Sequence, residues 1–221
     1  MVSLMSLLFD LSDPDLHAKL DQLETTPGYC ILVDRVGSTA LKDQPPRAWL
    51  SRIHDTFALV KSHLLAFQPL KIMGDALMYY IPESGLLEKN ALGLFLAMCF
   101  VVQERNKGVF GSYKVAITYC RNVYEVSFLE GARDVYGKDI DLTARLSSMA
   151  QDGQILMNEP FVEQVRFLYQ ASCVKHEFPD VRGIRGPDQE QIKGFTDPVN
   201  VYKLLAGGTS LSRQNYPEGL W

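Results

Sequence analysis

The stretch GYCILVDRVGSTALKD, residues 28–43, joins an apolar run to a polar turn. The run over 29–34 predicts a strand buried in the core. It ends at Asp34, and a glycine and two hydroxyl residues follow before a helix-like segment. A carboxylate at this point either caps the next helix or holds a metal ion beside backbone amides that receive phosphate oxygens.

The flanking segments predict alternating helices and strands. Helices are expected over 12–23, 46–67, 86–105 and 137–150, with a short one from 159. Besides residues 29–34, strands are expected in a hairpin over 70–81 and over 113–119, 123–129, 153–158 and 200–205. Residues 175–194 are polar and rich in glycine and proline, which predicts an irregular arm. Because hairpins require antiparallel pairs, the expected class is α+β.

The composition limits what the protein does. The 221 residues, 47% of them hydrophobic, suffice for one sizeable core. Lysine and arginine total 22 against 26 acidic residues, so no broad nucleic-acid surface is expected. No segment has about 18 uninterrupted apolar residues, the length that a membrane span needs. Four widely spaced cysteines without a C-x-x-C pair indicate neither a zinc site nor a disulfide framework. We therefore expect a cytoplasmic protein with no membrane partner.

Two groups of charged residues suggest chemistry. Asp34 ends the first strand, and Asp75 sits in the turn of the hairpin. If those strands are neighbours, the two carboxylates meet at one sheet edge, where they suit a pair of divalent cations. Asp134 precedes the helix that carries Asp141 and Arg145, four residues apart. Taken singly, these features also have plainer explanations: a Gly-Asp turn needs no metal, and an i,i+4 pair is often a solvent-exposed ion pair.

Four motifs in this order resemble the catalytic domain of class III nucleotidyl cyclases. They are LVDRVGST, KIMGDALM, DVYGKDIDLTARLSSMA with GQILMN, and IKGFTDPVNVYKL. The resemblance covers residues 28–205, which leaves 1–27 as a helical lead and 206–221 as a tail. It implies a ferredoxin-like antiparallel or mixed sheet with helices packed on one face. It also implies a head-to-tail homodimer with shared active sites, which converts a nucleoside triphosphate to a 3′,5′-cyclic nucleotide and pyrophosphate.

The resemblance also implies a role for each matching residue. Asp34 and Asp75 would bind two divalent cations, Mn²⁺ or Mg²⁺. Lys71 and Asp134 would recognise the base, and Arg145 would stabilise the transferring phosphate. The polyphosphate would lie on the backbone of Val36, Gly37, Ser38 and Thr39. Asp141 stands where most of the family has asparagine, so it would orient Arg145 or bind a sugar hydroxyl.

The choice of base stays open between several alternatives. Tyr119, Cys120, Arg121 and Asn122 replace small residues of the family, which predicts a smaller base if this strand borders the pocket. The motif YGKDIDLTARL and the expected lack of a sensor domain make the sequence resemble the stand-alone bacterial pyrimidine cyclases of anti-phage defence. Between the two pyrimidine substrates, UTP is favoured over CTP. Lys71 and Asp134 also resemble the adenine-reading pair of adenylate cyclases. A catalytically inactive cyclase-homology module that dimerises or binds nucleotide is the alternative of another class.

Overall fold

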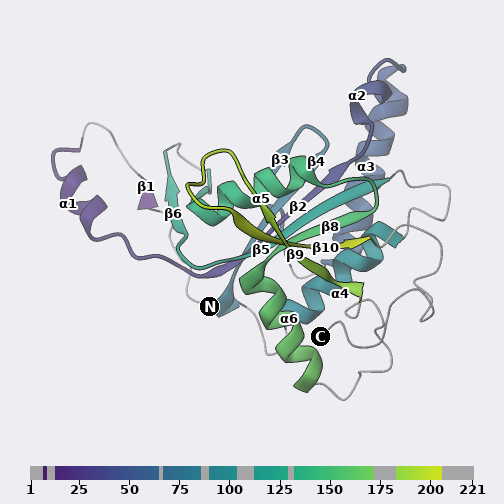
Figure 1. Ribbon diagram of the computed structural model, residues 1–221. Helices are drawn as coiled ribbons and strands as arrows, with labels where there is room; N and C mark the ends of the chain where they lie inside the picture. Colours follow the sequence, from purple (N-terminus) through teal and green to yellow (C-terminus); the bar gives the residue numbers. More distant parts are fainter. Residues whose placement is uncertain are drawn as a thin grey trace.

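A seven-stranded mixed sheet forms the centre of the protein (Figure 1). The structure, a computed structural model, describes residues 7–8, 13–64, 67–85, 90–103, 112–128, 132–171 and 183–205. The strands are, in spatial order, β3 (Lys71–Met73), β4 (Ala76–Pro82), β2 (Gly28–Arg35), β5 (Tyr113–Cys120), β8 (Gln154–Asn158), β10 (Val199–Leu205) and β9 (Arg185–Glu190). Only β5 and β8 pair in parallel within this sheet. The expected α+β class and mixed sheet are confirmed.

Strand β2 lies between β4 and β5, and its register sets the position of Asp34. Asp34 is opposite Lys114 at the start of β5, and Val33 is opposite Leu77 of β4. The turn between β3 and β4 comes just before Leu77, and its Gly74 has φ +67°, a left-handed conformation that suits glycine. This register therefore brings Asp75 to the same end of the sheet as Asp34.

Helices cover both faces of the sheet, although the resemblance implied one face. On one face lie α3 (Pro46–His63), α4 (Asn90–Gln103) and α6 (Glu159–Ala171), which build the main core with alternate side chains of the central strands. Helix α5 (Lys138–Met149) packs on the opposite face through Leu142 and Leu146 (Figure 1). Thr143 of α5 also forms a 2.5 Å hydrogen bond with Thr118 of β5. Both contacts fix which side of α5 faces solvent.

A second, small sheet lies beside the first. It contains β1 (Leu7–Leu8), β6 (Tyr124–Ser127) and β7 (Val135–Tyr136). The remaining short elements are α1 (Leu16–Asp21), α2 (Ser38–Leu41) and the 3-10 turn η1 (Glu83–Gly85). Strand β7 leads directly into α5, so this small sheet determines where Asp134 lies relative to that helix.

Most predicted elements are confirmed, with one clear exception. The irregular arm expected over 175–194 contains β9, which pairs with β10 at the sheet edge. Its residues are mostly exposed and polar, so β9 has no apolar alternation from which a strand would be predicted. Residues 206–221, the expected tail, lie outside the described residues. Among the helices described, none has both the length and the apolar character needed to cross a membrane.

Candidate active site

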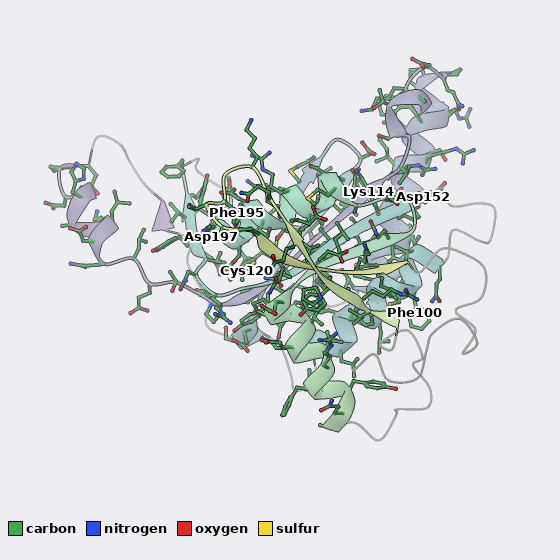
Figure 2. The ribbon with its side chains drawn as sticks, viewed as in Figure 1. Phe100, Lys114, Cys120, Asp152, Phe195 and Asp197 are labelled. Carbon is green, nitrogen blue, oxygen red and sulfur yellow. The ribbon has the colours of Figure 1, made fainter. Side chains whose placement is uncertain are left out.

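A pocket of about 660 Å³ opens at the end of the sheet where β2 stops and β5 begins. Its lining residues come from the β2–α2 turn, the β3–β4 hairpin, the start of β5 and the turn after α5: Asp34, Arg35, Val36, Gly37, Ser38, Thr39, Met73, Asp75, Ala76, Lys114, Ala150, Gln151 and Asp152. Figure 2 shows Lys114 and Asp152 close together at this end. Six of the predicted site residues therefore line one pocket: Asp34, Val36, Gly37, Ser38, Thr39 and Asp75.

The two predicted metal-binding carboxylates differ in their surroundings. Asp75 is only 8% exposed, and its Oδ2 is buried without a hydrogen-bond partner. Leaving a charged oxygen desolvated and unpaired is costly, which makes Asp75 ready to accept a cation. Asp34 is half-buried, and its Oδ2 accepts from Lys114 Nζ at 3.1 Å. These hard oxygen donors suit Mg²⁺ or Mn²⁺.

Among the described residues a third carboxylate, Asp152, also lines the pocket, but the three do not form one metal-binding cluster. Within these residues, no cluster of three or more His, Cys, Asp or Glu side chains could hold a metal ion. A pair of cations at Asp34 and Asp75 would therefore need oxygens from backbone, water or a bound phosphate. That requirement fits cations that enter together with a phosphorylated substrate, as Mg²⁺ commonly does.

Lys114 is one of the charged pocket residues that the sequence did not single out. Its ammonium lies in the pocket beside Asp34 because β5 pairs antiparallel with β2. The alternation of YKVAITYC gives no sign of this position, since the register between two strands is set far away along the chain. Lys114 adds a positive charge to a pocket that the predicted residues had made acidic.

The turn between β2 and α2 supplies backbone to the pocket wall, with one correction. The Val36 amide donates to the Ser112 carbonyl at 2.9 Å, so it is not free to receive phosphate as expected. Gly37 has φ +75° and directly precedes α2, whose first amides, at Ser38 and Thr39, have no helical acceptor. Helix α2 has only four residues, so these amides matter more than any helix dipole.

Buried Arg35, at the end of β2, stabilises the position of this turn through hydrogen bonds. It is 4% exposed, and its guanidinium donates to the Arg52 carbonyl at 3.0 Å and to Thr56 Oγ1 at 3.3 Å. Both acceptors belong to α3, so Arg35 links the end of β2 to α3. The pocket wall between these two elements is thereby held in place.

Lys71 and Asp134, which are predicted to recognise the base, form an ion pair. Asp134 Oδ1 accepts from Lys71 Nζ and from the Val135 amide, the latter at 2.7 Å. Tyr136 donates its hydroxyl to Oδ2 at 3.1 Å. Burial and the neighbouring Asp134 carboxylate raise the pKa of Tyr136, so its hydroxyl keeps the proton that it donates. Neither Lys71 nor Asp134 lines the pocket of Asp34.

Asp141 and Arg145 lie on the exposed side of α5, outside that pocket. Within the part of the chain that the structure describes, neither side chain has a recorded ion pair or hydrogen bond. The simple i,i+4 ion pair is therefore not formed, and both groups are free to meet a ligand or a partner. The predicted site residues therefore divide into those that line the carboxylate pocket and a second group that lies outside it: Lys71, Asp134, Asp141 and Arg145.

The residues expected to shrink the pocket lie elsewhere. Cys120 is opposite Gly28, at the start of β2, whereas the pocket lies at its end. Figure 2 shows Cys120 well separated from Lys114. Tyr119 donates its hydroxyl to Glu83 at 2.8 Å, and Arg121 donates its amide to Asp139 at 3.0 Å. Residues 119–122 therefore do not line this pocket; Cys120 packs instead in one buried cluster with Val135, which lies between Asp134 and Tyr136.

Solved structures with the same fold identify its type, although sequence comparison alone does not. No protein-family model matches the chain, and a search of curated proteins finds no similar sequence. The adenylyl cyclase CyaB from P. aeruginosa superposes with a TM-score of 0.65 at 18% identity, over 87% of this chain and 98% of that one. An adenylate cyclase from Trypanosoma brucei superposes with a TM-score of 0.61 at 18% sequence identity. The alignment covers 82% of this chain and 90% of that one.

A third neighbour extends the likeness to enzymes that act on another base. The guanylate cyclase domain of RhGC from Catenaria anguillulae, solved in complex with GTP, gives a TM-score of 0.62 at 10% identity. The alignment covers 81% of this chain and 96% of that domain. The neighbours share a mixed sheet with helices packed on it over nearly the whole catalytic domain. This chain has the fold of the class III nucleotidyl cyclase catalytic domain.

Proposed function

We propose that the protein is a nucleotidyl cyclase that converts a nucleoside triphosphate to a 3′,5′-cyclic nucleotide and pyrophosphate. The observation that carries the proposal is the meeting of Asp34 and Asp75 in one pocket, with an orphaned Asp75 oxygen and with the β2–α2 backbone beside them. The fold is consistent with cyclase chemistry, but the fold alone does not determine a function. The pocket residues are the reason for proposing this reaction. Two divalent cations and a triphosphate fit this set of groups.

The reaction joins the ribose 3′ oxygen to the α-phosphorus, and the bond from that phosphorus to the pyrophosphate oxygen breaks. The hydroxyl proton passes to solvent. Cations held by Asp34 and Asp75 would lower the pKa of the hydroxyl and neutralise phosphate charge. Lys114 and the amides of Gly37 to Thr39 would hold the phosphates in line for this displacement.

The second group of residues would come from the partner in a homodimer. Lys71, Asp134 and Arg145 do not line the pocket of their own protomer. A twofold head-to-tail pair places the second group of each chain against the pocket of the other, so each dimer has two shared sites. Arg145 would then contact the transferring phosphate with its planar fork of donors, and Asp141 would orient it or bind a sugar hydroxyl.

For the substrate, we favour UTP, with ATP as the alternative. Lys71 donates and Asp134 accepts, which matches a carbonyl oxygen beside the N3–H of uracil. The same pair also matches the ring nitrogen and amino group of adenine. The most specific part of the proposal is that cyclic UMP serves as a second messenger in anti-phage defence. Only the motif resemblance supports this part.

Incubation of the purified protein with Mn²⁺ and each of the four triphosphates tests the reaction and the base together. We expect cyclic UMP and an equal amount of pyrophosphate, measured by chromatography and mass spectrometry. Exclusive formation of cyclic AMP would move the substrate to ATP. Binding of nucleotide without any cyclic product would leave the inactive module as the function.

Replacing Lys114 tests a charged pocket residue that sequence reasoning missed. Lys114→Ala removes a charge-assisted contact to phosphate, worth about 1.5–3 kcal/mol, so KM should rise roughly tenfold or more. Lys203→Ala is the matched control, because Lys203 pairs with Asp188 at the far edge of the sheet. Steady-state rates at saturating Mn²⁺ give kcat and KM for each variant. Equal KM values for Lys114→Ala and the control would remove Lys114 from the phosphate site.

A further inference from the structure

We infer that Tyr136 is a positioning residue that sets base specificity, because it occupies an acceptor site of Asp134 and so disfavours guanine. The inference rests on the proposed function, in which Lys71 and Asp134 face the base. Nothing in the sequence motifs points to Tyr136 in this role. The contact that shows it is the hydrogen bond from the Tyr136 hydroxyl to Asp134 Oδ2 at 3.1 Å.

The geometry at Asp134 limits how many donors a base can offer. An ionised carboxylate has about four acceptor positions on its two oxygens. Lys71 Nζ and the Val135 amide take both positions of Oδ1, and the Tyr136 hydroxyl takes one position of Oδ2. One acceptor position on Oδ2 is therefore left for a ligand.

The strand around Tyr136 holds this arrangement in place. Val135 of β7 is buried in a hydrophobic cluster, which fixes the position of this strand. Asp134 and Tyr136 are the residues on either side of Val135 in the chain. The Tyr136 ring also packs edge-on against Phe128, with centroids 5.5 Å apart. The phenol is partly exposed at 41%, so a ligand can approach it.

A single acceptor beside a lysine donor distinguishes guanine from the other three bases. Uracil offers one N–H beside a carbonyl, and adenine and cytosine each offer an amino hydrogen beside a ring nitrogen. Guanine offers two adjacent donors, N1–H and the 2-amino group. With Oδ1 filled and Oδ2 half filled, one of these two donors stays without a partner, and an unpaired donor in a closed site weakens binding.

Removing the hydroxyl alone should open the site to guanine. In Tyr136→Phe, Oδ2 regains its second acceptor position, while the ring and its contact with Phe128 stay in place. We expect the affinity for guanine relative to uracil to rise about tenfold, the equivalent of about 1.4 kcal/mol. Affinity for the uracil nucleotide should change much less.

Tyr124→Phe is the matched control for this experiment. Tyr124 lies opposite Tyr136 on β6 and is similarly exposed at 38%. Its hydroxyl has no recorded hydrogen bond within the described residues, so the control removes the same atom from the same face without touching Asp134. The guanine-to-uracil ratio should not change in this variant.

The experiment measures binding and turnover separately. Isothermal titration calorimetry of the full chain with Mn²⁺ and the 3′-deoxy forms of GTP, UTP, ATP and CTP gives affinities, since these nucleotides lack the attacking hydroxyl. Turnover of the ordinary triphosphates is measured in parallel. Weak guanine binding by the wild type, and a raised guanine-to-uracil ratio in Tyr136→Phe alone, are the expected results.

The contrary results are distinct from failure of the proposed function. Wild-type protein that binds the guanine nucleotide best, or a ratio that is the same in Tyr136→Phe and Tyr124→Phe, overturns the role of Tyr136 even if the protein is a cyclase. Binding with the expected ratios but without cyclic product refutes the proposed reaction and leaves the role of Tyr136 intact. No binding of any of the four nucleotides refutes both.

Discussion

Changing both Asp34 and Asp75 to asparagine should lower the rate of cyclic-nucleotide formation by about 10³-fold or more. Asparagine keeps the size of each side chain but removes the charge that would hold the cations. The cations are expected to supply several kcal/mol of transition-state stabilisation, and each 1.36 kcal/mol changes the rate tenfold. Initial rates with Mn²⁺ and the preferred triphosphate measure the loss.

The same double variant should remain folded. Asp75 Oδ2 is buried without a partner, so removing its charge relieves a cost in the protein without metal. Losing the charge of the Asp34–Lys114 ion pair offsets part of this gain, so the midpoint of thermal unfolding, measured without divalent cations, should change little. Asp188→Asn is the control for a lost surface carboxylate, because Asp188 lies on β9 at the opposite edge of the sheet from β3. A double variant that keeps more than a tenth of the activity would refute the metal assignment.

Mixing two inactive variants should restore activity if the site is shared. One variant carries Asp34→Asn and Asp75→Asn, and the other carries Lys71→Ala and Arg145→Ala. Each heterodimer would then contain one site with every group intact and one site with all four changes. With random exchange of protomers, half of the dimers are mixed, so the sample should recover about a quarter of wild-type activity.

This complementation depends on the separation seen in the fold. Asp34 and Asp75 line the pocket, whereas Lys71 and Arg145 lie outside it. Lys71 forms an ion pair with Asp134, and Arg145 is exposed on α5. Purification of the heterodimer through two different tags, followed by initial-rate measurements, gives the activity of the single intact site. A heterodimer no more active than either parent would show that each protomer works alone or that the second group does not take part.

The central part of the fold and of the site could be predicted because its signals are local. The apolar run ending at Asp34 and the Gly-Asp turn of the hairpin are readable over a few residues each. The meeting of Asp34 with Asp75 was a conditional prediction, since it required β2 and β4 to be neighbours. The sheet order confirms that condition, and both side chains line one pocket.

The parts that the sequence did not predict depend on contacts between distant segments. Lys114 reaches the pocket only through the register of β5 against β2, and the Val36 amide is occupied by Ser112 from the start of β5. The same register puts Cys120 opposite Gly28, at the other end of β2 from the carboxylate pocket. A one-residue change of register would redirect every side chain of a strand, so local patterns do not determine these features.

The number of Mn²⁺ ions bound at the pocket tests the central claim most directly. Electron paramagnetic resonance titration of the full chain with Mn²⁺ and the 3′-deoxy form of the preferred triphosphate counts the ions without turnover. We expect about two ions per site, as two-metal catalysis requires, and loss of both in the Asp34→Asn, Asp75→Asn variant. Equal Mn²⁺ binding by the wild type and this variant would contradict a metal site formed by Asp34 and Asp75.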